Sequence, residues 1–309
     1  MPQRKTEQLY AMERSLDALP LSEAATAISR ANVEAAQVVE ACSKVIAQGA
    51  MTMAATIRGG GILYYVAAGS SGLMAAADAM ELGGTFGIPT SQVRILMAGG
   101  VPTTANMPGD VEDESRSLKA DLGAIGPSDC LIVVSASGDT PYAVTAAQIG
   151  KAAEAPVIAI ANNRNAALFE FADHVIFLDT PPEILSGSTR LGAGTAQKIA
   201  LNSLSTLMGV ELGHVFRGRM VNLHADNEKL HARARRIVQD ISDVDETTAA
   251  QALNTADNDV KVACLIASGA RTPDEAQTVL RSAEGRIDRA LARLETTKTD
   301  SRDNWRQPQ

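Results

Sequence analysis

A strand–loop–helix unit between Gly60 and Thr85 constrains the fold more than any other stretch of the chain. Residues 62–67 form an apolar run rich in β-branched and aromatic side chains, which is typical of a buried strand. The small residues AGSSG follow at 68–72, and the alanine-rich segment after them predicts a helix. This order of elements is typical of a fold in which strands and helices alternate.

Further short apolar runs predict four more strands, at 93–98, 130–135, 156–161 and 174–178. Helical or polar segments separate these runs, as in strand–helix–strand units. Because strands joined by crossover helices pair in parallel, the sequence predicts an α/β fold with a doubly wound parallel sheet.

The segments before and after this alternation predict helices. Residues 21–58 have helical spacing and predict two helices, at 21–32 and 33–58, and the chain beyond 242 breaks into short helical segments. We therefore expect N-terminal helices before the sheet and a small C-terminal helical bundle after it. The expected divisions are an N-terminal arm at 1–20, a main domain at 21–240, a small helical domain at 241–295 and a polar tail at 296–309.

Charge and composition exclude several kinds of partner. The net charge of −8 and the pI near 5.1 argue against a nucleic-acid surface, and an aromatic content of 3% leaves few side chains for stacking on bases. No apolar run approaches the roughly 20 residues that a membrane span needs. The N-terminus has no signal-like apolar segment. We expect a cytoplasmic protein that binds neither nucleic acid nor membrane and holds any anionic ligand by local geometry.

The spacing of cysteine and histidine predicts no metal site. Cys42, Cys130 and Cys264 lie far apart and form no CxxC pair, so they are interpreted as reduced packing residues. The four histidines form neither an HxH nor an HExxH pattern.

Two loops that follow strands predict an anion site. The first contains Ser70, Ser71 and Gly72, and the second, SASGDT at 135–140, follows the strand at 130–135. Glycine, hydroxyl groups and the free N–H groups of a helix start can together hold a phosphate. Ligands of such sheets bind at the carboxyl ends of the strands, so both loops are expected to meet one ligand. The second loop contributes three candidate contacts: Ser137, Gly138 and Thr140.

Two carboxylates have the positions that proton transfer beside this anion site would require. Glu81 lies on the helix after the first loop, and Glu112 lies in an acidic stretch after the strand at 93–98. Taken alone, each residue fits a solvated surface position better than a catalytic one. The alternative is a pair that flanks a sugar ring, with one carboxylate as base and the other as acid.

Two further polar clusters are candidate ligand contacts. The loop that precedes the predicted helix at 195–212 is either a surface loop or a second anion contact, through Ser186, Ser188, Thr189 and Arg190. The cluster at 227–229 is either a helix cap with an exposed ion pair or part of the site, and consists of Asn227, Glu228 and Lys229.

Taken together, these segments resemble the N-acetylmuramic acid 6-phosphate etherase family, within the sugar isomerase (SIS) fold. The most similar stretch is SGSTRLGAGTAQKIALNSLST at 186–206. The motifs AGSSG, AGG, SASGDTPY and NEKL also occur in the family's order and spacing. The resemblance implies that the main domain is an SIS-type sandwich that binds sugar phosphate. The chain is more remotely similar to the glucokinase regulatory protein, which shares this fold and binds sugar phosphates without turning them over.

The resemblance implies a carbon–oxygen lyase that needs neither a metal nor an organic cofactor. Enzymes of the family cleave the lactyl ether of N-acetylmuramic acid 6-phosphate, giving N-acetylglucosamine 6-phosphate and D-lactate by elimination and hydration. The family's two catalytic glutamates match Glu81, in DAMELGGT, and Glu112, in GDVED. By this resemblance Glu112 removes the proton next to the aldehyde carbon, and Glu81 assists lactate departure and water addition. The phosphate would be held by four hydroxyl side chains, Ser70, Ser71, Ser137 and Thr140.

The chain departs from the family pattern where the family keeps three cations and this sequence has Leu73, Asp139 and Gly192. Two other functions on this fold therefore stay open, a non-catalytic sugar-phosphate-binding regulatory protein and an aldose–ketose isomerase. The resemblance also implies a homodimer and a role in peptidoglycan recycling.

Overall fold

A five-stranded parallel sheet organises the first two thirds of the chain. The structure is a computed structural model that describes residues 4–107, 111, 118–225 and 227–303. The strands are β1 (Leu63–Ala67), β2 (Val93–Met97), β3 (Cys130–Ser135), β4 (Val157–Ala161) and β5 (His174–Phe177). They pair in the order β2-β1-β3-β4-β5, so the order reverses between β1 and β3. The predicted doubly wound α/β fold is confirmed, and all five strands lie where apolar runs were found.

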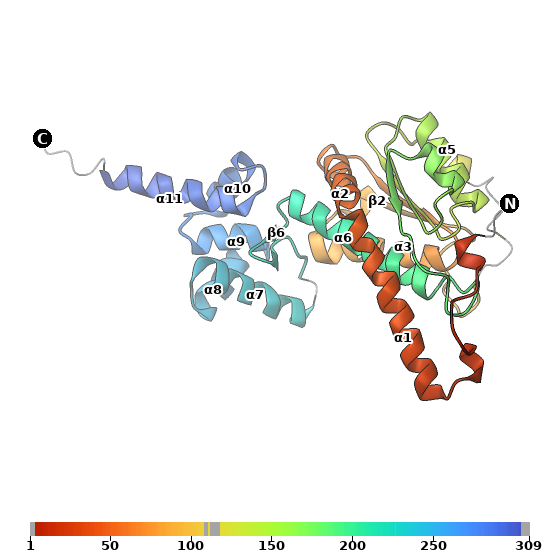
Figure 1. Cartoon of the computed structure of the whole chain (residues 1–309). Coiled ribbons are helices and arrows are strands. Elements are labelled where there is room, and N and C mark those ends of the chain that lie inside the picture. The colour runs from red at the N-terminus through yellow and green to blue at the C-terminus, as the bar shows by residue number, and fades with distance from the viewer. Residues whose placement is uncertain (1–3, 108–110, 112–117, 226, 304–309) are drawn as a thin grey trace, which may run out of the picture. The chain divides into compact units, whose positions relative to one another are not determined.

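Helices cover both faces of this sheet (Figure 1). Alternate residues of the strands, such as Val66 and Val133, pack in one cluster with α5 (Pro141–Ala152) and α4 (Leu118–Asp121). On the other face, Gly49 of α2 (Ser43–Arg58) lies so close that a Cβ there would be 3.3 Å from Ile158 Cδ1 of β4. Because both faces are covered, strand β4 is buried throughout, as its uninterrupted apolar sequence predicts.

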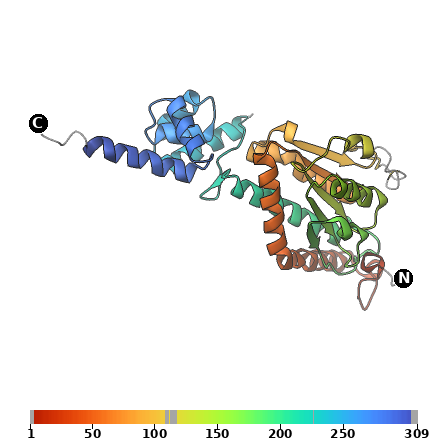
Figure 2. The same cartoon turned by 90° about the horizontal axis from the view of Figure 1, so that it is seen from above.

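The remaining elements of this part connect or flank the strands, and Figure 2 shows the same arrangement from above. Helix α6 (Gly192–Glu211) has bounds close to those expected, whereas α3 (Gly69–Phe86) begins within the predicted loop at 68–72. Short 3-10 helices lie at η1 (Lys5–Glu7), η2 (Leu16–Ala18), η4 (Thr90–Gln92) and η5 (Ala167–Phe171).

The break between the two N-terminal helices lies further along than predicted. Helix α1 (Leu21–Gln37) runs without interruption into η3 (Val38–Cys42), and α2 follows. The prediction of a boundary at 32/33 is wrong, because neither Gly nor Pro marks the real break. The change of helix type begins at Val38 and Val39, whose β-branched side chains are less favourable in an α-helix.

The chain divides into two compact units. The first comprises Met1–Met80 and Pro89–Met208, and the second comprises Glu81–Ile88 and Gly209–Gln309. The second unit contains the hairpin of β6 (Val215–Phe216) and β7 (Arg219–Met220), followed by α7 (Glu228–Ser242), α8 (Glu246–Thr255), α9 (Val260–Ala267), α10 (Pro273–Ser282) and α11 (Ile287–Asp303). The hairpin was not predicted, although Arg217 and Gly218, both with positive φ, form the two-residue turn that such strands favour.

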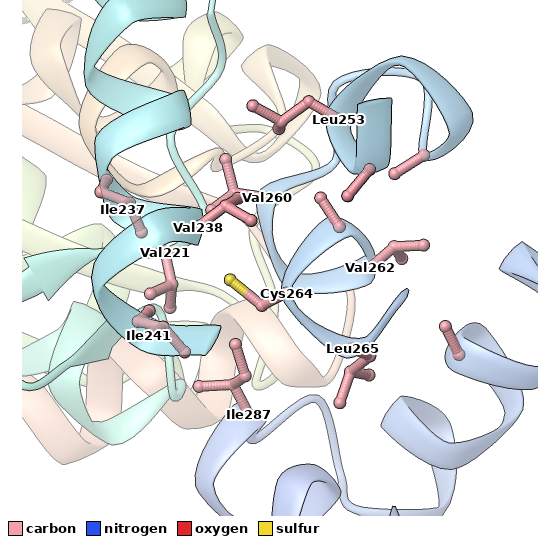
Figure 3. Close-up of a cluster of buried hydrophobic side chains, with 14 of the residues drawn as sticks. Val221, Ile237, Val238, Ile241, Leu253, Val260, Val262, Cys264, Leu265 and Ile287 are labelled. Carbon is pink, nitrogen blue, oxygen red and sulfur yellow. The ribbon is translucent and has the colours of Figure 1, made fainter. Parts of the chain in front are cut away.

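A separate hydrophobic core holds the second unit together. Val238 of α7, Leu253 of α8, Cys264 of α9 and Ile287 of α11 converge in it (Figure 3). Asn227, Asp245, Asp259 and Thr272 cap the starts of α7 to α10 by accepting backbone N–H bonds. One charged side chain, Lys261 of α9, is 4% exposed in this part, and its Nζ donates to Gly285 O at 2.9 Å.

All three cysteines are buried and unbridged. Burial raises the pKa of the Cys42 and Cys130 thiols, and it raises that of Cys264 to about 12. Within the described ranges, none of the helices combines the length and the apolar character needed to cross a membrane.

Candidate active site

The second predicted loop forms a cluster of three hydroxyl groups at the end of β3. Ser135 Oγ lies 2.9 Å from Thr140 Oγ1 and 3.4 Å from Ser137 Oγ, and Ser137 Oγ lies 3.4 Å from Thr140 Oγ1. The Gly138 N–H donates to Ser135 Oγ at 3.0 Å, and the Asp139 N–H donates to Ser137 Oγ at 3.2 Å. The loop is thus folded around hydroxyls that a phosphate could engage. Ser135 was not predicted as a site residue, because it ends an apolar strand.

Local geometry explains why this loop requires glycine and leads into a helix. Gly138 has φ of +77°, and a Cβ there would lie 2.1 Å from the Ala166 Cβ, so a side chain cannot fit. Thr140 is the N-cap of α5 and Pro141 is its first residue, where the missing N–H is no loss. The positive end of the α5 dipole therefore lies at the hydroxyl cluster.

The first predicted loop is the first turn of a helix. Helix α3 begins at Gly69, so Ser70, Ser71 and Gly72 belong to its first turn, and the Gly72 N–H donates to Ala68 O at 3.0 Å. Ser71 is buried and Ser70 is half-buried. A Cβ on Gly72 would lie 2.8 Å from Met97 Cγ, which accounts for glycine at this position.

Strand register places the two loops side by side. Ala67 of β1 pairs with Val134 of β3, and both strands are parallel, so the loops that contain Ser70 and Ser137 follow adjacent strands at the same edge. This edge is also where the strand order reverses, the usual ligand position in such sheets. The expectation that both loops face one ligand is consistent with this placement.

The structure describes only one of the two predicted catalytic glutamates. Glu81 is exposed on α3, three residues after the buried Asp78. Glu112 lies outside the described residues. Their pairing around a sugar ring therefore stays a prediction.

Asp78 is at the centre of a buried network that was not predicted. Its carboxylate accepts from Tyr65 Oη at 2.9 Å, Asn202 Nδ2 at 2.7 Å and Ser205 Oγ at 2.8 Å. Burial raises the pKa of the Tyr65 phenol well above its usual value, and the Asp78 charge adds to this shift. The network joins β1, α3 and α6. Asp78 carried no sequence signal beyond its place on an alanine-rich helix.

The loop at 186–190 precedes helix α6, whose N-terminus is already occupied by a carboxylate of the chain. The buried Glu183 accepts from the N–H groups of Gly192 and Ala193, each at 2.8 Å. Burial raises the pKa of Glu183, and the two N–H bonds partly oppose that shift. Gly192, where the family keeps a cation, thus supplies a backbone donor to Glu183. The predicted roles of Ser186, Ser188, Thr189 and Arg190 stay predictions.

An N-terminal segment, defined as residues 4–8, connects this loop with the hydroxyl cluster. Gly187 N–H donates to Thr6 O at 3.3 Å, and Ser186 Oγ donates to Glu7 O at 3.2 Å. Asn163, which follows β4, accepts from Lys5 N–H at 3.0 Å. The same Asn163 donates to the carbonyl oxygens of Ala136 and Ser137, at 3.1 and 3.2 Å. The segment, expected only as a polar arm, is therefore attached to two predicted ligand loops.

Arg4 of this segment lies beside the phosphate loop. Its Nη2 is 2.7 Å from Asp139 Oδ2. A positive charge therefore lies next to position 139, where this sequence has an aspartate in place of the family's cation. A cavity of about 770 Å³ opens at this edge of β3, β4 and β5, lined by Arg4, Lys5, Gln8, Asp139, Asn162, Asn163, Arg164, Asn165, Phe177 and Asp179.

The third predicted cluster lies in the second unit. Asn227, Glu228 and Lys229 are all exposed, and Asn227 Oδ1 accepts from the Leu230 N–H at 3.0 Å. The capping interpretation of Asn227 is confirmed, whereas a ligand contact by these three residues stays a prediction. Among the residues that the structure describes, no three His, Cys, Asp or Glu side chains come together as a metal site would require.

Comparisons with known proteins identify the family of this chain. Residues 28–162 match the family model described as SIS domain. An N-acetylmuramic acid 6-phosphate etherase from Deinococcus radiodurans is 38% identical over 300 residues, covering 96% of this chain and 98% of the relative. The etherase of the same name from Actinobacillus pleuropneumoniae serotype 5b is 34% identical, covering 93% of this chain and 95% of the relative. The chain therefore belongs to the N-acetylmuramic acid 6-phosphate etherase family.

Proposed function

We propose that this protein is a cytoplasmic lyase that cleaves the lactyl ether of N-acetylmuramic acid 6-phosphate, giving N-acetylglucosamine 6-phosphate and D-lactate. The observation that carries the proposal is the cluster of Ser135, Ser137 and Thr140 hydroxyls at the N-terminus of α5. Hydroxyl donors and a helix N-terminus together suit a phosphate monoester. Relatives that match nearly the whole chain carry the etherase name, which supports this substrate.

In the proposed reaction the ring-opened sugar is bound by its phosphate at the two loops. Glu112 removes the proton from the carbon next to the aldehyde, and the electron pair expels lactate from the neighbouring carbon. Glu81 gives a proton to the departing lactate oxygen and then assists the addition of water to the alkene. The carbonyl acidifies the proton that is removed, so carboxylates suffice as acid and base.

The direct test is incubation with N-acetylmuramic acid 6-phosphate and assay of D-lactate. Glu81→Gln is expected to lower the rate by roughly a hundredfold or more, because general acid–base groups contribute about that much. Glu170→Gln, an exposed carboxylate on η5, is the matched control and should retain activity. Glu112→Gln should abolish solvent deuterium exchange at the carbon next to the aldehyde.

The outcomes separate this proposal from the two alternatives. No D-lactate at high protein concentration, with thermal stabilisation by sugar phosphate, would instead support a regulatory protein. Interconversion of aldose and ketose phosphates without lactate would support an isomerase. Neither alternative is favoured by the names of the relatives.

We also propose that the protein is a homodimer that acts in peptidoglycan recycling. Exposed apolar side chains on α1, Leu21 at 89% and Val33 at 54%, support an interface between copies. Light scattering that gives the monomer mass would contradict the dimer. A deletion strain should accumulate N-acetylmuramic acid 6-phosphate if the enzyme serves this pathway.

A further inference from the structure

The loop that is proposed to hold phosphate also carries a negative charge of its own. Asp139 lies between Gly138 and Thr140, and its N–H donates to Ser137 Oγ, so the loop that contains the hydroxyl cluster also contains a carboxylate. A carboxylate in this loop repels a phosphate dianion bound there, and the repulsion is stronger near protein than in bulk water. Binding a dianion here requires a compensating positive charge.

The N-terminal segment provides that charge. Arg4 Nη2 lies 2.7 Å from Asp139 Oδ2, and the Ala167 N–H donates to Asp139 Oδ1 at 2.9 Å. Each oxygen of the carboxylate is thus directed at a donor. The Asp139 side chain is 27% exposed and that of Arg4 is 52% exposed, so the pair is only partly screened by water.

The backbone of the segment is fixed by contacts that do not involve Arg4. Thr6 is 4% exposed, and its carbonyl oxygen accepts from the Gly187 N–H. Lys5 contributes its N–H to Asn163 and its Nζ to Asp179 Oδ1, 2.7 Å away. Arg4 is therefore held beside the loop whether or not its charge contributes to binding.

We infer that Arg4 is a specificity-determining residue that acts through Asp139: its guanidinium neutralises the carboxylate, so that the loop accepts a phosphate dianion. The inference rests on the proposed function, since it concerns the same sugar-phosphate site. It makes the N-terminal segment part of that site. It also means that Arg4 favours phosphorylated sugars over the same sugars without phosphate.

The test compares binding of N-acetylglucosamine 6-phosphate and of inorganic phosphate to five variants by calorimetry at low salt. Arg4→Gln should raise both dissociation constants roughly tenfold, because one nearby charge loses its partner. Lys151→Gln is the matched control, since it removes an ion pair with a similarly exposed cation at the opposite end of α5 from the hydroxyl cluster, and should change them less than about twofold. Asp139→Asn should bind at least as tightly as the natural protein, and Arg4→Gln with Asp139→Asn should recover its affinity.

Two conditions distinguish charge from a merely structural role. The loss caused by Arg4→Gln should shrink in high salt, which screens partly exposed charges. It should also shrink below about pH 6, where a phosphate monoester loses its second charge. Arg4→Lys should retain most of the affinity.

Other results would overturn the inference. Unchanged affinity of Arg4→Gln, an equal loss in Lys151→Gln, or a double variant no better than Arg4→Gln would each do so. The readout is binding, so natural protein that binds both probes but releases no D-lactate would refute only the proposed reaction. Natural protein that binds neither probe would refute the phosphate site and the inference with it.

Discussion

At the residue scale, the candidate phosphate site depends on the last residue of β3. The Ser135 hydroxyl accepts from the Gly138 N–H and lies 2.9 Å from Thr140 Oγ1, although the residue is 4% exposed. It holds the turn of the loop and faces the same point as the other two hydroxyls. A bound phosphate would therefore contact a group that also shapes the loop.

Replacing Ser135 with alanine should weaken phosphate binding. Hydrogen bonds to charged groups contribute about 1.5–3 kcal/mol, so the dissociation constant for N-acetylglucosamine 6-phosphate should rise roughly ten- to hundredfold. Ser203→Ala is the control, since that hydroxyl donates to Ile199 O within α6. Titration calorimetry measures both, and equal affinity of the two variants would contradict the prediction.

Sequence reasoning found most of this loop but not all of the residues around it. Ser137, Gly138 and Thr140 were predicted because glycine and hydroxyls followed a strand. Ser135 was assigned to the apolar run, although a hydroxyl at the carboxyl end of a strand was a usable signal. Arg4 could not be found, because its contact with Asp139 depends on where the N-terminal segment lies in three dimensions.

At the element scale, helix α3 connects the first loop to Glu81 and is anchored between them by Asp78. The Asp78 carboxylate ties α3 to Tyr65 of β1 and to Asn202 and Ser205 of α6. Apolar periodicity predicted these elements well, because burial repeats along each one. It gave no information on a polar contact whose three donors lie on two other elements.

Asp78→Ala should therefore destabilise the protein and misplace α3. Two buried donors and the half-buried Asn202 lose their acceptor, and each such group costs about 1 kcal/mol or more, so a loss of about 3 kcal/mol in the free energy of unfolding is expected. Tyr65→Phe, which removes one donor only, should cost about 1 kcal/mol. Denaturant titration of both variants checks the order. Equal stability of Asp78→Ala and the natural protein would show that the network contributes nothing.

Lys261 of α9 is a buried lysine that should make the stability of the protein depend on pH. Burial lowers the pKa of Lys261 to about 8 from 10.5. At pH 7 the Lys261 ammonium is charged in both the folded and the unfolded chain, so its burial lowers the free energy of unfolding by about 3 kcal/mol. The hydrogen bond to Gly285 O offsets part of this loss. Lys261→Met should therefore be more stable at pH 7, by about 2 kcal/mol.

The sign of the pH dependence follows from linkage. Between about pH 8 and 10.5 the unfolded chain binds the Lys261 proton more tightly than the folded one, so the natural protein gains stability as pH rises. The advantage of Lys261→Met should shrink over this range. Lys44→Met, at an exposed position of α2, is the control and should show no such trend in thermal unfolding. A constant advantage at all pH values would contradict the assigned cause.

At the scale of the whole molecule, the chain divides into two compact units, and the described residues of each contain a hydrophobic core. The sequence predicted a separate C-terminal helical domain through the change from strand–helix alternation to short helices alone. The boundaries of 240/241 and 295/296 stay predictions. The end of α3 joins the second unit even though its start belongs to the first, because residues far apart in sequence pack together there. Phe86 O, for example, accepts from Asn222 Nδ2 at 2.9 Å.

The two units each contain a buried cysteine thiol, whose chemical modification would report when the core around it opens. Alkylating reagents attack thiolates, and Cys130 of β3 and Cys264 of α9 are both 0% exposed with raised thiol pKa values. Iodoacetamide should therefore modify them only when the surrounding core opens. Mass spectrometry of the two peptides would follow the two cores in one experiment. Complete modification within minutes at pH 7 would show that these cores are not closed, whereas unequal rates would report which unit opens first.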